Sequence, residues 1–332
     1  MISTGVIGAG NMGRYHGGIL SRQLNACVVA VADTSAERAQ SLADALGCRV
    51  AASAAELIES AEIDAVVVTT PTAAHRLYVE AAANAGKHIF CEKPLARTMK
   101  EGEAMIAAAE RAGVKMSVGH VVRWFPQYEQ IRRSVLDGTI GKPGTARVTR
   151  GASFPRATND WYADYEQSGG VMLDMVIHDL DWLLWTFGPV RRVFARRIEG
   201  QPGYDGGMIS LRHESGVISY AEGNWSYPSG FYTSVEVAGD DGLLMGDNTS
   251  TSPLRMDMRE DGARGAAVEV PTGGSRSADP YELEIRDWLG WIAGGPPPRC
   301  TATDALDALR VALAALESAE TRQPVELNGG GR

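Results

Sequence analysis

The feature that most constrains the fold is an alternation in the first 119 residues, where short apolar runs are separated by alanine-rich helical segments. The runs are GVIGAG, CVVAVAD, DAVVVTTP, KHIFCEKP and VKMSVGH. Strands that alternate with helices form a parallel sheet with helices on both faces. A strand covered on both faces is continuously apolar, as AVVV is. The alternation therefore predicts an α/β fold whose N-terminal part is a doubly wound parallel sheet of the Rossmann type.

The pattern changes after residue 121. A helix at 126–136, a strand at 142–151 and an apolar helix at 169–185 precede a series of strand-like runs up to residue 271, and helices at 278–292 and 303–320 end the chain. Several runs alternate with period two, which predicts a largely antiparallel open sheet with one covered face. A single core seldom grows past about 250–300 residues. The 332 residues therefore predict two domains, a dinucleotide-binding domain at 1–120 and an α+β domain at 121–332.

Composition argues against several partners. A net charge of -9 disfavours nucleic acid, which requires a basic surface. The one dense basic run, VRRVFARR, is interpreted as the solvated face of a strand. No apolar run approaches the roughly 18–20 residues of a membrane helix. The chain starts almost directly in a strand and its four cysteines are scattered, so we expect no signal peptide, no zinc site and a cytoplasmic protein with reduced thiols.

A glycine loop follows the first predicted strand. Gly8, Gly10 and Gly13 have G-x-G-x-x-G spacing at the start of a helix, which allows a tight turn and aims backbone N–H groups at a pyrophosphate. Alone the pattern also fits an ordinary glycine-rich turn. The next strand ends at Asp33, where an acid accepts hydrogen bonds from the adenosine ribose. Because this carboxylate would repel a 2′-phosphate, NAD is favoured over NADP, although Arg38 partly offsets the repulsion.

Two further segments place ionisable groups beside apolar ones. GGVMLDMVIHDLDWLLW is read as one buried helix, in which Asp174 and His178 at i and i+4 would share a face and converge on one bound molecule. In isolation the pair is better explained as a core histidine satisfied by a neighbouring carboxylate. Glu92 and Lys93 follow a buried strand, so their side chains should point toward the cofactor cleft. In isolation they also fit a solvated loop.

Together these motifs resemble the glucose–fructose oxidoreductase / inositol dehydrogenase (Gfo/Idh/MocA) family of two-domain NAD(P)-dependent oxidoreductases. The resemblance rests on GAGNMGRYH, TTPTAAH, EKP and GGVMLDMVIHDLD, in the family's order. It implies that Lys93 is the active-site lysine, that its bond to Pro94 is cis, and that Asp174 and His178 are the catalytic pair. It also implies that residues 121–332 bind substrate and form a homodimer or homotetramer through their sheet, whose exposed face we expect to carry Phe231, Val235 and Val237.

The remaining site residues follow from the glycine loop, the resemblance and the loop before the polar helix. The expected cofactor-binding residues are Gly8, Gly10, Asn11, Met12, Gly13, Asp33, Thr70, Pro71, His75, Glu92, Lys93 and Arg123. The expected substrate-binding residues are Lys93, Arg156, Trp161, Asp174 and His178, and no metal ligand is expected. Aromatic and polar groups such as Trp161 and Asn159 suit a sugar or cyclic polyol, whereas Arg150 and Arg156 leave room for a sugar acid.

The expected activity is transfer of a hydride between a secondary alcohol of a sugar or cyclic polyol, inositol-like, and the nicotinamide of NAD. His178 would take the hydroxyl proton as general base. Asp174 would orient the His178 imidazole or bind another substrate hydroxyl, and Lys93 would stabilise the developing alkoxide. Lys93 with a lowered pKa is the other candidate for the base. The alternatives are an NADP-dependent sugar or diol reductase, an NAD-dependent glycosidase, and a non-catalytic regulator that binds a dinucleotide. The dehydrogenase requires the amine of Lys93 and the Asp174–His178 pair to meet over the same nicotinamide ring.

Overall fold

The structure is a computed structural model that describes residues 1–156, 160–198, 204–249, 254–258, 267–269 and 279–327. The chain divides into two compact units, each of which is described by itself. The first unit contains Met1–Val121 and Ala278–Leu306, and the second contains Val122–Ser277 and Asp307–Arg332. Asn159, expected in the substrate loop, lies outside the described residues.

The described residues of the first unit form a six-stranded sheet in the order β3-β2-β1-β4-β5-β6, with every pair parallel. Its strands are β1 (Ile2–Ile7), β2 (Ala26–Ala32), β3 (Arg49–Val50), β4 (Ala65–Val68), β5 (His88–Cys91) and β6 (Met116–Val118). Its helices include α1 (Asn11–Leu20), α2 (Ala36–Leu46), α3 (Ala54–Glu59), η1 (Thr72–Ala74), α4 (His75–Asn84) and α5 (Met99–Ala112). This strand order is that of a doubly wound dinucleotide-binding sheet. The predicted Rossmann fold is confirmed.

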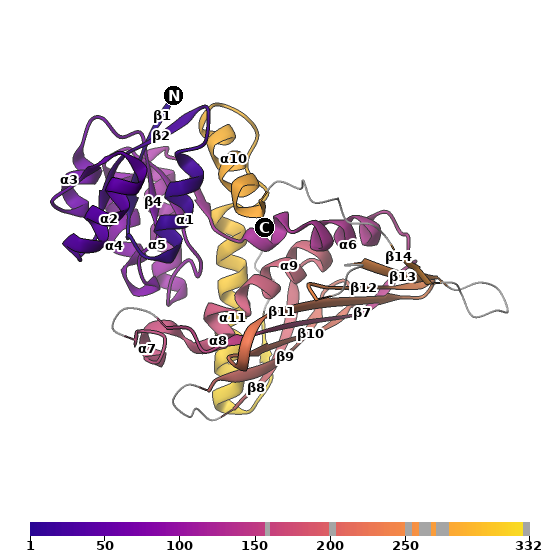
Figure 1. Cartoon of the computed structure of the whole chain (residues 1–332). Helices are drawn as coiled ribbons and strands as arrows, with labels where there is room; N and C mark the ends of the chain where they lie inside the picture. The colour runs from indigo at the N-terminus through magenta and orange to yellow at the C-terminus, as the bar shows by residue number, and fades with distance from the viewer. Residues whose placement is uncertain (157–159, 199–203, 250–253, 259–266, 270–278, 328–332) are drawn as a thin grey trace. The chain divides into compact units, whose positions relative to one another are not determined.

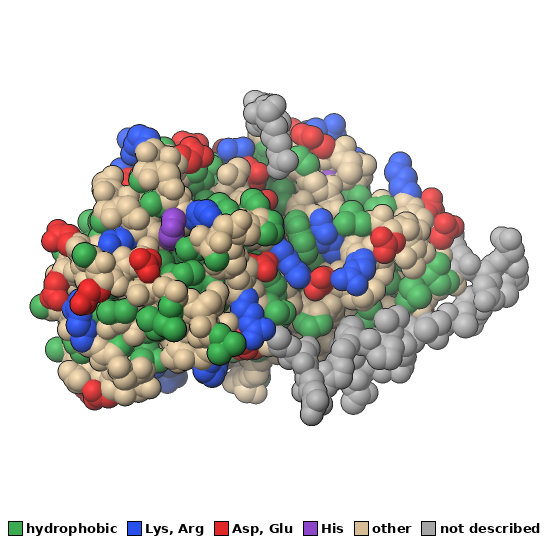
Figure 2. All heavy atoms as spheres, turned by 90° about the horizontal axis from the view of Figure 1, so that it is seen from above, with side chains coloured by type: hydrophobic (Ala, Val, Ile, Leu, Met, Phe, Trp, Pro, Cys, Tyr) green, Lys and Arg blue, Asp and Glu red, His purple; other side chains and the backbone are tan. Residues whose placement is uncertain are grey.

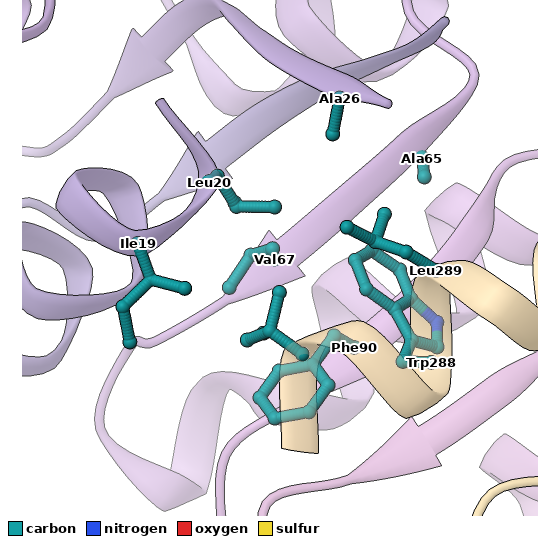
Figure 3. Close-up of a cluster of buried hydrophobic side chains, with 9 residues drawn as sticks. Ile19, Leu20, Ala26, Ala65, Val67, Phe90, Trp288 and Leu289 are labelled. Carbon is teal, nitrogen blue, oxygen red and sulfur yellow. The ribbon is translucent and has the colours of Figure 1, made fainter. Parts of the chain in front are cut away.

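One helix from the end of the chain belongs to this unit, which differs from the expected division at residue 120. Helix α10 (Pro280–Ile292) lays Trp288 and Leu289, both fully buried, against Leu20 of α1, Val67 of β4 and Phe90 of β5. Figure 3 shows the indole of Trp288 among these side chains. The apolar stripe of α10 therefore covers part of one face of the parallel sheet, and residues 278–306 group with the first unit rather than with the second.

The described residues of the second unit form a nine-stranded sheet in the order β14-β13-β12-β11-β7-β10-β9-β8-β15 (Figure 1). The strands are β7 (Pro143–Ser153), β8 (Val190–Arg197), β9 (Gly206–His213), β10 (Ile218–Asn224), β11 (Ser226–Gly239), β12 (Gly242–Asp247), β13 (Leu254–Met258), β14 (Ala267–Glu269) and β15 (Val325–Glu326). The helices include η2 (Val121–Trp124), α6 (Pro126–Leu136), α7 (Tyr165–Ser168), α8 (Gly170–Asp174), α9 (Ile177–Phe187) and α11 (Ala302–Thr321), of which η2 and α11 each lie partly in the first unit. The strand pairs are antiparallel except β10 with β7, as the prediction of a largely antiparallel sheet required.

The two faces of this sheet differ in burial. Helices α6, α8 and α9 contact strands of the sheet, and they cover one face. Val235 and Val237 are buried on that covered face, so their predicted exposure was wrong. Side chains alternate along β11, but the alternation alone does not tell which of the two sides the helices cover. Phe231 lies on the same side of β11 as Val235 and Val237, beside Arg150, and is half exposed there, so it does not belong to the open face either. On other strands Met208 and Tyr220 are exposed, which marks them as part of the open face.

The arginine-rich run forms β8, in which Val193 and Ala195 are buried while the four arginines are exposed, as its interpretation as a solvated strand face predicted. On the side of the molecule that Figure 2 shows, Lys and Arg side chains lie interspersed with Asp and Glu side chains. None of the helices in the described part of the chain has the length and apolar character needed to cross a membrane.

Candidate functional site

The glycine loop joins β1 to α1 and has the geometry of a phosphate cradle. Gly8 has a φ of +102°, a conformation that side chains disfavour, and a Cβ on Gly13 would lie 1.9 Å from the Gly8 carbonyl oxygen. Gly10, in contrast, faces open space, and a Cβ added there would meet no atom within 4 Å. The turn is therefore closed by Gly8 and Gly13, while the backbone at Gly10 and the start of α1 stays open to an anion. These residues fit the pyrophosphate of a dinucleotide.

Asp33 follows β2 and ties the glycine loop to the next strand. Its Oδ2 accepts from the Ala9 amide over 2.7 Å, and its Oδ1 accepts from the Ser35 amide over 2.7 Å and from the Arg38 guanidinium over 2.6 Å. Burial alone would raise the pKa of Asp33, but these bonds lower it below its ordinary value. A carboxylate held ionised at this position suits the ribose hydroxyls of NAD.

The loop after β4 contains Thr70, Pro71 and His75, expected to line the cofactor. Thr70 is half-buried and Pro71 is exposed, whereas the His75 ring is buried. His75 Nε2 lies 2.9 Å from the Thr70 carbonyl oxygen, and Nδ1 lies 3.0 Å from the carbonyl oxygen of Pro94. Burial lowers the pKa of His75, although both carbonyl oxygens oppose this shift. The His75 ring thus lies between the loop after β4 and the loop after β5.

Glu92, Lys93 and Pro94 follow β5, as expected from the sequence. The Lys93–Pro94 peptide bond is cis, which confirms the expectation. Lys93 is half-buried, and Glu92 is buried with one oxygen 2.6 Å from His16 Nε2 and the other accepting from the Lys93 amide over 3.1 Å. Burial would raise the pKa of Glu92, but the His16 bond and the Lys93 charge lower it below its ordinary value. A carboxylate is therefore kept ionised beside Lys93.

In the second unit the polar helix is interrupted, and its prediction as one continuous helix was wrong. Helix α8 ends at Asp174 and α9 begins at Ile177. At the break the Val176 amide donates to the Val171 carbonyl, five residues earlier, and the His178 amide reaches the Met175 carbonyl over 3.4 Å. Such a π-type turn changes the direction of the helix locally. Asp174 and His178 therefore do not lie one turn apart on a single helix: Asp174 ends α8 as a buried residue, and half-buried His178 lies in the first turn of α9.

The other two acids of this segment are paired with arginines. Asp179 accepts two hydrogen bonds from Arg150 of β7, over 2.7 and 2.8 Å. Asp181 accepts two from Arg123 of η2, over 2.8 and 2.6 Å. All four side chains are buried. These ion pairs explain how an apolar helix tolerates Asp179 and Asp181, and they give Arg123, expected to bind cofactor, a structural partner within its own unit.

The loop before α8 carries the remaining predicted substrate residues. Arg156 is exposed. Trp161 is half-buried and stacks on Tyr162 with ring centroids 4.0 Å apart, and Tyr162 meets Trp225 edge to face. An aromatic cluster is therefore present where an aromatic platform for a ring-shaped substrate was expected. Within the described residues no group of three or more His, Cys, Asp or Glu side chains could hold a metal ion.

Two supporting residues were not identified from the sequence. His16 was quoted only as part of a motif, and its bond to Glu92 joins residues 76 positions apart. Asp205 accepts from the Val171 amide over 2.7 Å and so caps the start of α8. Burial raises the pKa of Asp205. A single acid in a turn gives no signal that it caps a distant helix, so neither role had a local marker.

Comparison with known proteins agrees with both units. Residues 2–120 match the family model of an oxidoreductase family with an NAD-binding Rossmann fold, and residues 128–245 match the GFO/IDH/MocA C-terminal domain. The myo-inositol 2-dehydrogenase of Thermotoga maritima is 31% identical over 97% of this chain and 98% of its own. The 1,5-anhydro-D-fructose reductase of Ensifer adhaerens is 32% identical over 98% of both chains.

A solved structure gives the same result in three dimensions. The crystal structure of a probable dehydrogenase from Thermotoga maritima superposes with a TM-score of 0.83 at 29% identity, covering 98% of each chain. The expected resemblance is therefore confirmed over both units. The protein belongs to the glucose–fructose oxidoreductase / inositol dehydrogenase (GFO/IDH/MocA) family of oxidoreductases with an NAD-binding Rossmann fold.

Proposed function

We propose that the protein is an NAD-dependent dehydrogenase that oxidises a secondary alcohol of a sugar or cyclic polyol. The observation that carries this proposal is the arrangement within the first unit. The open glycine loop and the ionised Asp33 follow β1 and β2, and the Glu92–Lys93 segment follows β5, all at carboxyl ends of one parallel sheet. Ligands of open α/β sheets bind at these ends. The names of the relatives, an inositol dehydrogenase and a sugar reductase, support the substrate class.

The cofactor would be held by groups with distinct tasks. The backbone from Gly8 to Gly13 would bind the pyrophosphate, and Asp33 would accept from the adenosine ribose. Thr70, Pro71 and Glu92 would line the nicotinamide half. NAD, when bound, supplies the hydride acceptor. Arg38 forms a salt bridge with Asp33, and its positive charge would favour a 2′-phosphate. NADP is therefore the second candidate cofactor.

The proton chemistry falls to three side chains. An alcohol hydroxyl is a very weak acid at neutral pH, so its oxidation requires a positioned base that accepts the proton. His178 would take this proton, Asp174 would bind a neighbouring hydroxyl or orient the imidazole, and Lys93 would donate to the reacting oxygen as its negative charge develops. In the second assignment Lys93 is the base. A pH profile that loses one limb in His178→Gln but keeps it in Lys93→Arg would favour the first.

The charges of the second unit favour a neutral substrate. Arg150, which had left room for a sugar acid, has its charge balanced by Asp179 in a buried pair. Arg156, the other arginine that had left room for a sugar acid, is exposed. A neutral polyol is therefore the better match, with the stacked rings of Trp161 and Tyr162 as an apolar surface for its ring.

We also propose a homodimer or homotetramer formed through the open face of the large sheet. Met208 and Tyr220 are 60% and 42% exposed on this face, and large apolar side chains exposed together favour burial against a partner. Light scattering on the wild-type protein and on Met208→Arg tests this proposal. The variant should have a smaller mass; equal masses would contradict it.

The function itself is tested by a substrate panel. Inositols, neutral aldoses and sugar acids are each incubated with NAD or NADP, and formation of the reduced cofactor is followed by absorbance. We expect reduction of NAD by at least one neutral polyol or sugar. Release of free sugar from a glycoside without net reduction would favour the glycosidase, and dinucleotide binding without turnover on the whole panel would favour a regulator.

A further inference from the structure

We propose that His16 and His75 are positioning residues that hold the Glu92–Lys93–Pro94 segment from its two sides. The inference rests on the proposed function, in which Lys93 is the residue that meets the reacting oxygen. Both histidines are buried, at 0% and 1% exposure. His16 lies on α1, which precedes β4 in the sequence, and His75 lies on α4, which follows it. Each ring bonds to a residue adjacent to Lys93.

His16 fixes the residue before the lysine. Its Nε2 lies 2.6 Å from Glu92 Oε1, whereas its Nδ1 has no hydrogen-bond partner in the described part of the chain. A neutral imidazole with its proton on Nε2 satisfies this arrangement, because it donates to the carboxylate and leaves only a lone pair unbonded. The edge of the ring also packs on Phe90, with centroids 5.1 Å apart. Glu92 in turn accepts from the Lys93 amide, so the contact continues to the lysine backbone.

His75 fixes the residue after the lysine. Its two ring nitrogens lie 3.0 Å from the carbonyl oxygen of Pro94 and 2.9 Å from that of Thr70. The ring therefore lies between the loops that follow β4 and β5. A neutral imidazole carries one N–H, so it donates to only one of these two carbonyl oxygens. We assign the proton to Nδ1, because only that N–H donates to the Pro94 carbonyl oxygen and so anchors the loop after β5.

The consequence is that Lys93 extends from a segment whose neighbours are both tied to buried rings. A lysine has a flexible side chain, and its ammonium reaches a reacting oxygen reproducibly only if its backbone is fixed. Displacement of a catalytic group by about 1 Å costs roughly a hundredfold in rate. Loss of either imidazole should therefore lower turnover without removing any group that contacts substrate.

The experiment compares apolar and hydrogen-bonding replacements in the full-length enzyme. His75→Leu and His16→Leu should each lower kcat roughly a hundredfold at saturating NAD and substrate, with the KM for the substrate little changed. His75→Gln and His16→Gln keep an amide donor and should recover most of the loss. His88, a half-buried ring at the opposite end of β5, supplies the control: His88→Leu should leave kcat unchanged.

A double-mutant cycle with Lys93→Ala separates positioning from general damage. If His75 and His16 act through the lysine, their leucine variants should cause no further loss of turnover in the Lys93→Ala background. Equal losses in both backgrounds, or glutamine variants no better than leucine, would overturn the inference alone. A Lys93→Ala enzyme with normal turnover would instead overturn the proposed role of Lys93.

Discussion

The buried pair of Arg150 and Asp179 gives a prediction whose size follows from its geometry. The guanidinium and carboxylate share two hydrogen bonds of 2.7 and 2.8 Å, and the side chains are 2% and 1% exposed. Asp179→Ala would leave the Arg150 charge buried without its main counter-charge, and breaking such a pair costs about 3–5 kcal/mol. Replacing both residues with apolar ones, as in Arg150→Met with Asp179→Leu, removes the uncompensated charge and should recover most of that stability.

The assay is thermal and urea unfolding followed by tryptophan fluorescence. For a unit of this size each kcal/mol corresponds to about 2–4 °C, so Asp179→Ala should lower the melting temperature by roughly 6–20 °C. The matched control lies on the same strand, where Arg147 faces Glu236 over 3.6 Å with both side chains exposed. Arg147→Met should cost about 1 kcal/mol or less. The reasoning is refuted if Asp179→Ala costs no more than this control, or if the double variant is as unstable as the single one.

Three further predictions concern the first unit. Gly10→Ala should fold normally, because nothing lies within 4 Å of the added Cβ, but it should bind NAD about tenfold or more weakly by calorimetry. Gly13→Ala should instead lose stability, because its Cβ would meet the Gly8 carbonyl oxygen. Asp33→Ser should raise the ratio of NADP to NAD efficiency at least about tenfold in steady-state kinetics, because Arg38 would be released from its partner; adding Arg38→Ala should cancel the gain. The pKa of Glu92 is lower in the folded protein than in the unfolded chain. Ionised Glu92 therefore stabilises the folded protein at pH values above the ordinary carboxyl pKa, and this stabilisation is lost as the pH falls through the pKa of the folded state. The free energy of unfolding, measured as a function of pH in the acid range, should therefore depend less steeply on pH in Glu92→Gln than in the wild-type protein. An unchanged slope would contradict a lowered pKa of Glu92.

Local pattern was enough to predict most elements. Helix α6 has its expected bounds, 126–136, because Pro126 in the first turn marks where it begins. The strand β3 was missed because its two residues are too short to show a period. The glycine loop and Asp33 were identified because their spacing along the chain is itself the geometric requirement.

Features that depend on distant partners were not predictable in the same way. The stripe of α10 shows that the helix is covered, but not that Trp288 packs on Phe90 of the parallel sheet. Likewise Asp179 and Asp181 stand in an apolar segment of the sequence, but nothing near them in the sequence identifies Arg150 and Arg123 as the partners that neutralise them. The turn at Val176 was missed because valine and methionine are compatible with a continuous helix and mark no break in the sequence.

The most direct test of the account is the turnover of Lys93→Ala with the best substrate of the panel, measured together with its affinity for NAD. The matched control is Lys100→Ala, which removes an exposed lysine of α5. We expect Lys93→Ala to bind NAD as the wild-type protein does and to lose turnover by about a hundredfold or more, while Lys100→Ala retains both. Normal substrate oxidation by Lys93→Ala would contradict the central claim that Lys93 serves the reacting oxygen.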